Sequence, residues 1–123
     1  MHQAKKKRHP SLSVWGTGNA IRDFLYVDDC ADAVLFLLQT YESPQWINIS
    51  SHTQSSISEL ALSIRDVVQF EGEIVFDTTY PDGMPKKVLC HKRLSDLGWK
   101  PSHSLKEGLE KTYRWATKEK QLL

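Results

Sequence analysis

The chain has 123 residues, and its 16 Lys or Arg residues nearly balance 15 Asp or Glu residues to give a formal net charge of +1. This length allows one domain with a modest core. The near-neutral charge excludes any general electrostatic argument for binding nucleic acid or an acidic membrane surface, so we expect neither partner.

The cysteine and histidine patterns carry no site signature. Cys30 and Cys90 are far apart and show no CxxC spacing, and the five histidines are not paired in any metal-binding motif. We therefore expect no metal site, no disulfide framework and a reducing compartment. The first residues lack the apolar segment of a signal peptide, and no apolar run approaches the ~20 residues that span a bilayer. The sequence thus predicts a cytoplasmic chain.

Residues 1–12 form a polar and basic lead-in. No capping residue precedes Met1, so we expect residues 1–8 to be the end of a helix whose earlier turns lie upstream. The basic run at residues 5–8 is typical of a solvated surface, and we prefer that interpretation to a nuclear address or a phosphate patch.

The most informative stretch is 14–29, which has the pattern of a strand, a glycine turn, a second strand and a helix start. Gly16 and Gly18 allow the backbone angles of a sharp turn. The run Phe24–Val27 is rich in strand-forming residues, and Asp28 or Asp29 is expected to cap the following helix.

Trp15 and Arg22 are expected on the two strands that flank this glycine turn. A flat aromatic ring beside a guanidinium group suits a nucleotide-like anion, since the ring stacks and the guanidinium binds phosphate oxygens. An ordinary hairpin with a surface Trp and an ion-paired Arg is the alternative.

The remaining patterns predict alternating helices and strands, an order that fits an α/β or α+β fold. We expect a helix from Asp29 that has an apolar face and stops before Ser43-Pro44. The elements expected after it are a strand at Trp46–Ile49, a helix from the capping box Ser56–Glu59 to Glu71–Gly72, a strand at Glu73–Asp77, a turn at 81–85 and a short strand from Val88. The chain is then expected to end with a short helix at Lys92–Leu97, closed by Gly98, and a last helix from a second capping box, Ser104–Glu107.

Catalytic motifs are mostly absent from the sequence. It has no GxGxxG, no GxxxxGK[ST], no Tyr-x-x-x-Lys and no GxSxG. The pair Asp28-Asp29 fits helix capping better than acid/base chemistry. Cys90 and His91 are adjacent in an extended segment and point to opposite sides, which argues against a thiol–imidazole couple.

Several segments together resemble the C-terminal part of the GDP-L-fucose synthases, a family of extended short-chain dehydrogenase/reductases. The resemblance is carried by residues 14–18, 22–33, 47–49, 72–87, 97–99 and 105–115. The most specific marker is the segment Pro81-Asp82-Gly83-Met84-Pro85-Lys86-Lys87. Two departures stand out, because Ser50-Ser51-His52 replaces a glycine-rich turn and Cys90 replaces an aspartate.

The resemblance implies the substrate-binding portion of such an enzyme, with the nucleotide-binding half largely absent. It implies a basic lead-in at 1–12, a substrate-binding unit at 13–118 and a tail at 119–123. Trp15, Arg22, Asp82 and Lys87 match positions at which the family contacts its GDP-sugar. A turn-initiating Asp82 and a solvated Lys87 are the structural alternatives.

The family uses NADPH to convert GDP-4-keto-6-deoxymannose to GDP-L-fucose and forms homodimers. Its Ser-Tyr-Lys catalytic set lies upstream of the matched region, so we expect this chain alone to be inactive and to bind no NADP(H). Two other hypotheses stay open. One is a non-catalytic interaction module that pairs Trp46–Ile49 with another chain, and the other is part of a different nucleotide-sugar epimerase or dehydratase.

Overall fold

The computed structural model describes residues 1–118, so the predicted tail at 119–123 lies outside the described residues. The elements are α1 (His2–Lys6), β1 (Ser11–Trp15), β2 (Ile21–Asp23), α2 (Val27–Thr40), β3 (Gln54–Ser56), α3 (Ile57–Val68), β4 (Glu73–Asp77), β5 (Lys86–Lys87), α4 (Lys92–Asp96) and α5 (Leu105–Lys118). This order confirms the predicted mixed α/β class. The boundaries of the predicted functional units stay predictions.

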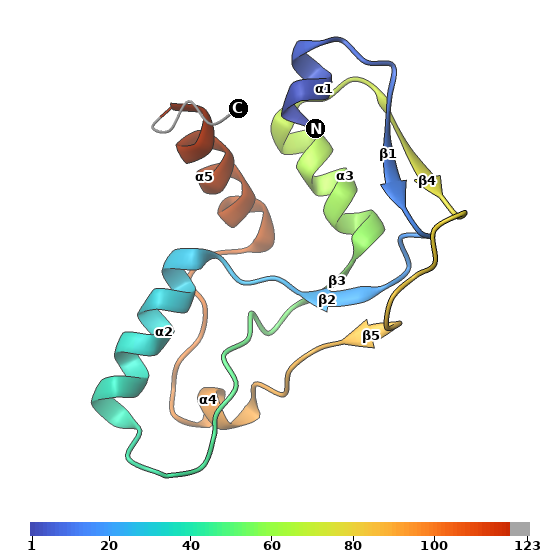
Figure 1. Cartoon of the computed structure of the whole chain (residues 1–123). Coiled ribbons are helices and arrows are strands. Elements are labelled where there is room, and N and C mark those ends of the chain that lie inside the picture. The colour runs from blue at the N-terminus through green and yellow to red at the C-terminus, as the bar shows by residue number, and fades with distance from the viewer. Residues whose placement is uncertain (119–123) are drawn as a thin grey trace.

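Two small sheets organise the strands (Figure 1). In the first, β1 runs parallel to β4, with Ser11 opposite Glu73 and Trp15 opposite Asp77. In the second, β2 pairs antiparallel with β3 and parallel with β5. The strand β2 follows β1 directly, so the glycine loop between them connects the two sheets.

Buried apolar residues form two separate clusters. The first joins α1, α3 and the turn between α3 and β4 through Ala4, Val68 and Phe70. The second joins α2 and α4 through Ala33, Leu94 and Trp99. Figure 1 shows these two groups of elements at opposite ends of the molecule, with β2 crossing between them.

Both predicted capping boxes are confirmed. The Glu59 backbone N–H donates to the Ser56 hydroxyl at 3.1 Å, and the Ser56 N–H donates to the Glu59 carboxylate at 2.7 Å. Ser104 and Glu107 make the same reciprocal pair. The predicted end of α3 at Glu71–Gly72 is wrong, because the helix ends at Val68 and Gln69 takes the left-handed position with φ of 56°.

The second predicted strand is wrong in position. Residues 21–23 pair with β3 and β5, whereas Phe24–Val27 are not paired and line an apolar cavity of about 270 Å³ against α5. These apolar residues therefore pack against α5 and do not form the backbone hydrogen bonds of a strand. The predicted cap is also wrong, because α2 begins at Val27 without a side-chain cap, and Asp29 is buried and bonded to His103 instead.

Two further strand predictions are wrong. Val88–Leu89 lie just past β5, which comprises Lys86–Lys87. Trp46–Ile49 are extended, but no strand of residues 1–118 pairs with them. Side chains bond this backbone instead, because Arg93 donates to the Trp46 carbonyl and Asn48 donates to the Cys90 carbonyl. Residues 46–49 thus have the apolar composition of a strand, but they have no neighbouring strand with which to form a ladder of backbone hydrogen bonds.

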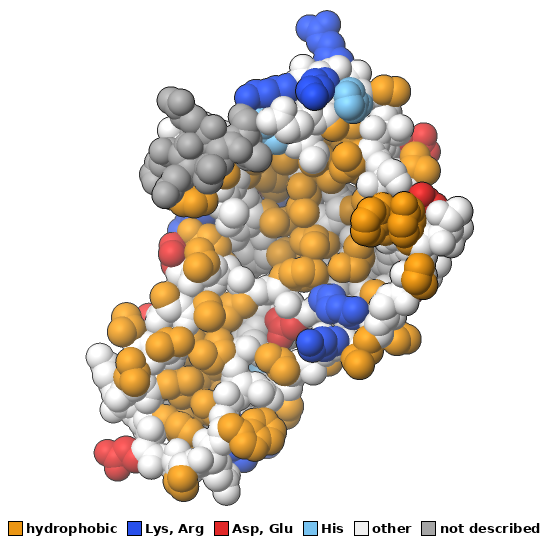
Figure 2. Space-filling view, viewed as in Figure 1, with side chains coloured by type: hydrophobic (Ala, Val, Ile, Leu, Met, Phe, Trp, Pro, Cys, Tyr) orange, Lys and Arg blue, Asp and Glu red, His pale blue; other side chains and the backbone are white. Residues whose placement is uncertain are grey.

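The predicted apolar face of α2 faces mainly outward. Ala33 is fully buried, whereas Leu35 is 60% exposed and Leu38 is 79% exposed. Figure 2 shows hydrophobic side chains gathered on the surface over this helix. The helix packs instead through Ala33, Phe36 and Leu37, which lie on a different face from the one its sequence pattern predicts. Within residues 1–118, none of the helices is both long and apolar enough to span a membrane.

Candidate functional site

The loop between β1 and β2 is a tight turn that depends on two glycines. Gly16 and Gly18 have φ of +82° and +79°, which confirms the predicted turn. A Cβ on Gly16 would overlap the Asp82 carboxylate, and a Cβ on Gly18 would lie 2.5 Å from the Phe76 ring. Glycine is needed at both positions for angle and for space.

Asp82 ties the 81–85 loop to this glycine turn. The Thr17 backbone N–H donates to Oδ1 at 2.8 Å, and the Thr17 hydroxyl donates to Oδ2 at 2.5 Å. The hydroxyl bond and then the backbone bond lower the pKa of Asp82 below its usual value, so the carboxylate stays charged. Asp82 therefore has the structural role in a turn that was the alternative to substrate binding. Each of its carboxylate oxygens still has a free lone pair that can accept a hydrogen bond from another donor.

Arg22 and Lys87 lie side by side on neighbouring strands. They are register partners in the parallel β2–β5 pair, so their side chains leave the same face. The Arg22 guanidinium donates to the Ile21 carbonyl at 2.7 Å, and a Cβ on Gly83 would lie 3.7 Å from its Nη2. Figure 2 shows Lys and Arg side chains gathered over β2 and β5.

Trp15 ends β1 and is 70% exposed. Its ring stacks on Tyr80, with centroids 4.4 Å apart and an interplanar angle of 13°. Tyr80 was not among the predicted site residues. The available signal was Asp77-x-Thr79, a spacing that favours a turn able to bring the next residue back towards β1.

The structure therefore places all four predicted residues around the glycine turn and the loop it contacts. Trp15 adjoins the turn, Asp82 bonds into it, and Gly83 links Asp82 to Arg22 and its neighbour Lys87. An exposed ring, two cations and an acid on one surface suit an anion that also carries a flat ring and hydroxyl groups. Their binding roles stay predictions.

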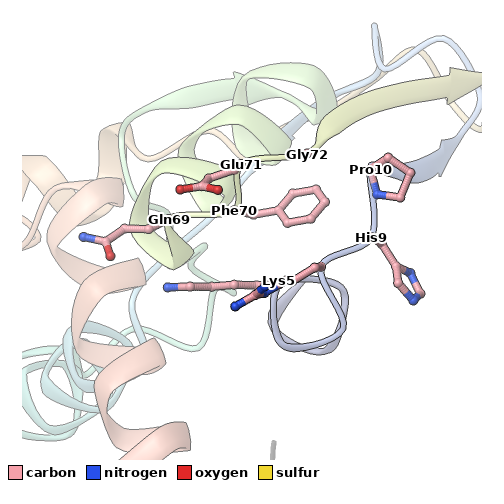
Figure 3. Close-up of a pocket in the computed structure, with 8 residues that line it drawn as sticks. Lys5, His9, Pro10, Gln69, Phe70, Glu71 and Gly72 are labelled. Carbon is pink, nitrogen blue, oxygen red and sulfur yellow. The ribbon is translucent and has the colours of Figure 1, made fainter.

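A separate hollow lies away from these residues. It has a volume of about 540 Å³, and Figure 3 shows it between the end of α1 and the α3–β4 turn. Lys5 spans it and donates to the Val68 carbonyl at 2.8 Å, while the Phe70 ring points towards Pro10. It shares no residue with the predicted site.

Residues 50–52, which replace the glycine-rich turn of the family, make specific side-chain contacts in this structure. The hydroxyls of Ser50 and Ser51 both donate to the carboxylate of Asp23, at the end of β2. His52 takes a left-handed φ of 66° and stacks on His91, with ring centroids 4.2 Å apart. Burial and the nearby His91 lower the pKa of His52 below its usual value. These side chains fix the segment that joins the extended 46–49 stretch to β3.

Comparison with known proteins points to one group. The sequence model of the NAD dependent epimerase/dehydratase family matches residues 1–50. The chain is 51% identical over 112 residues to a GDP-L-fucose synthase of Sinorhizobium fredii, and 44% identical over 114 residues to a probable GDP-L-fucose synthase 1 of Oryza sativa. The first match covers 91% of this chain and 36% of its relative, and the second covers 93% and 35%.

The chain is a homologue of the GDP-L-fucose synthases over about one third of their length. A solved GDP-L-fucose synthetase from Naegleria fowleri superposes with a TM-score of 0.90 at 26% identity, covering 98% of this chain and 37% of that one. A GDP-mannoheptose C4 reductase from Campylobacter jejuni gives a TM-score of 0.79 at 30% identity, with coverages of 94% and 41%. The fold is thus that of one part of the extended reductase and epimerase enzymes.

Proposed function

We propose that this chain forms the GDP-sugar-binding side of a GDP-L-fucose synthase, in which Trp15, Arg22, Asp82 and Lys87 contact the substrate. The observation that carries the proposal is the pairing of Arg22 with Lys87 beside the loop that Asp82 ties to Thr17. A diphosphate carries about two negative charges, which a guanidinium and an amine together offset through charge-assisted hydrogen bonds. Asp82 accepts from ribose or sugar hydroxyls.

The whole protein would convert GDP-4-keto-6-deoxymannose to GDP-L-fucose with NADP(H), in the cytoplasm and as a homodimer. Similarity to proteins named GDP-L-fucose synthase supports this proposal, and the Naegleria fowleri relative has been solved bound to NADP. The chain spans about a third of those relatives. NADP(H) and the catalytic groups belong, in this proposal, to the part of the relatives' length that the chain does not match.

A non-catalytic interaction module is the second candidate. The exposed apolar face of α2 and the unpaired stretch 46–49 favour it, because both offer surface to another protein. In that case the site around the glycine turn would be structural. A different nucleotide-sugar epimerase or dehydratase is the third candidate and would prefer a UDP-sugar.

Calorimetric titration with GDP, GDP-mannose and UDP-glucose tests these candidates. We expect selective binding of the GDP compounds. Lys87→Ala should weaken GDP binding by about 10-fold or more, since a hydrogen bond to a charged group contributes about 1.5–3 kcal/mol. Lys86→Ala is the matched control, because this exposed neighbour on β5 faces the other side.

Each other outcome identifies a different function. A preference for UDP-glucose would assign the chain to another epimerase or dehydratase. A folded chain that binds none of the three compounds would favour the interaction module. Equal losses of GDP affinity in Lys86→Ala and Lys87→Ala would refute a specific role of Lys87 in binding.

A further inference from the structure

Trp15 and Tyr80 form an exposed aromatic stack at the end of β1. The two rings are nearly parallel, yet Trp15 remains 70% exposed and Tyr80 43% exposed. Tyr80 therefore covers one face of the indole and leaves most of its other surface open. An open indole face backed by a second ring is a surface on which another flat ring stacks.

A hydrogen-bonded turn after β4 holds Tyr80 against Trp15. Asp77 is the register partner of Trp15, so the end of β4 lies beside the end of β1. The Asp77 carboxylate accepts from the Thr79 backbone N–H at 3.0 Å and from its hydroxyl at 2.6 Å, and the Tyr80 N–H donates to the Asp77 carbonyl at 3.4 Å. These bonds reverse the chain immediately after β4 and return the Tyr80 ring to the indole.

The same loop connects the stack to the two cations. Asp82 follows Tyr80 by two residues and bonds to Thr17, and Gly83 then lies against the Arg22 guanidinium. The aromatic stack and the Arg22–Lys87 pair thus lie on either side of the Asp82–Thr17 contact. A nucleoside diphosphate has the same layout, with a flat base and a charged diphosphate on either side of a ribose.

We infer that Tyr80 is a positioning residue that fixes the Trp15 indole as a stacking platform for the nucleobase, while Arg22 and Lys87 bind the diphosphate. This inference rests on the proposed function and adds to it the site of the base. The ring of Tyr80 performs the role, since no hydrogen bond described within residues 1–118 involves its hydroxyl. Losing such a platform is expected to weaken nucleotide binding by about 5- to 100-fold.

The test compares GDP with inorganic pyrophosphate, which has the charges without the base. Tyr80→Ala should weaken GDP binding by about 10-fold and leave pyrophosphate binding nearly unchanged. Tyr80→Phe keeps the ring and should restore GDP binding. Trp46→Ala is the matched control, because Trp46 is 78% exposed at a distance from the glycine turn and should alter neither affinity.

Ligand-free NMR relaxation of the Trp15 indole N–H gives an independent measurement. The indole should become more mobile in Tyr80→Ala and not in Tyr80→Phe. The inference is overturned if the indole is unchanged in Tyr80→Ala, or if GDP and pyrophosphate weaken equally. A folded wild-type chain that binds neither ligand defeats the proposed function and the base platform together, whereas binding of both without a Tyr80 effect defeats the platform alone.

Discussion

The α1–α3 end and the α2–α4 end of the molecule differ in how completely their apolar side chains are covered. At one end, β1 pairs with β4, and Phe70 and Val68 are 5% and 4% exposed under α1. At the other end, α2 exposes Leu38 and the stretch 46–49 has no neighbouring strand within residues 1–118. A strand pattern gives a paired strand only where a neighbouring strand is also present, whereas the α2 pattern gives a helix even though Leu35 and Leu38 stay exposed.

The largest expected effect tests whether the α2–α4 end has a cooperative core. Leu94 is fully buried against Ala33 and Trp99. Leu94→Ala should reduce the free energy of unfolding by about 2–5 kcal/mol, because it leaves a cavity in that cluster. Denaturant unfolding measures the change, with Leu97→Ala as the control, since Leu97 is 39% exposed just beyond the same helix. Equal losses in both variants would mean that this end lacks a specific core.

An intermediate effect is expected at the contact that joins α2 to the segment before α5. Burial of Asp29 favours the neutral acid, but hydrogen bonds from the His103 ring and backbone N–H outweigh this and lower its pKa. Asp29→Asn should reduce the free energy of unfolding by about 1–3 kcal/mol at neutral pH. Asp28→Asn, on the exposed side of the same turn, is the control.

The pH dependence of that variant follows from the direction of the shift. Because the folded pKa of Asp29 is lower than the unfolded value of 3.8, its contribution is complete above that value and is lost as the pH falls through the folded pKa. The difference between the wild type and Asp29→Asn should therefore shrink below about pH 4. A difference that stays constant down to pH 2 would contradict the role of the charged carboxylate.

The smallest effect on stability, and the most direct test of the difference between the two ends, comes from the exposed face of α2. We expect the chain to self-associate through this face. Leu38→Ser should reduce association in sedimentation velocity while changing the free energy of unfolding by only about 0.5 kcal/mol. Leu62→Ser on α3, where the side chain is 41% exposed, should leave association unchanged. A wild-type chain that sediments as a monomer at all concentrations would refute this expectation.

Local chemistry was the most predictable part of the fold. The capping boxes at Ser56 and Ser104 and the glycine turn at Gly16 use residues whose role depends on their immediate neighbours, so the sequence predicted them correctly. The misplaced strand at Phe24–Val27 has a tertiary cause, because its residues pack against α5 instead of pairing. Asp29 was assigned as a cap because nothing in its sequence indicates a bond to His103, 74 positions away.

The candidate site shows the same division. Trp15 and Arg22 were expected to flank one turn, and they do. The approach of Asp82 to Thr17 and the stacking of Tyr80 on Trp15 join positions 65 residues apart, and no local pattern predicts such contacts. Asp23 was missed for the same reason, since its partners Ser50 and Ser51 come from a distant segment.

The parallel pairing of β1 with β4 also determines when this end of the molecule can fold. Ser11 and Glu73 are far apart in the sequence, so pairing them closes a long loop. This closure has a high entropic cost and raises the contact order of the fold. During synthesis, β1 is made before β4, so it stays unpaired until residues 73–77 have been added. Refolding should therefore be limited by this late strand pairing rather than by the formation of α3.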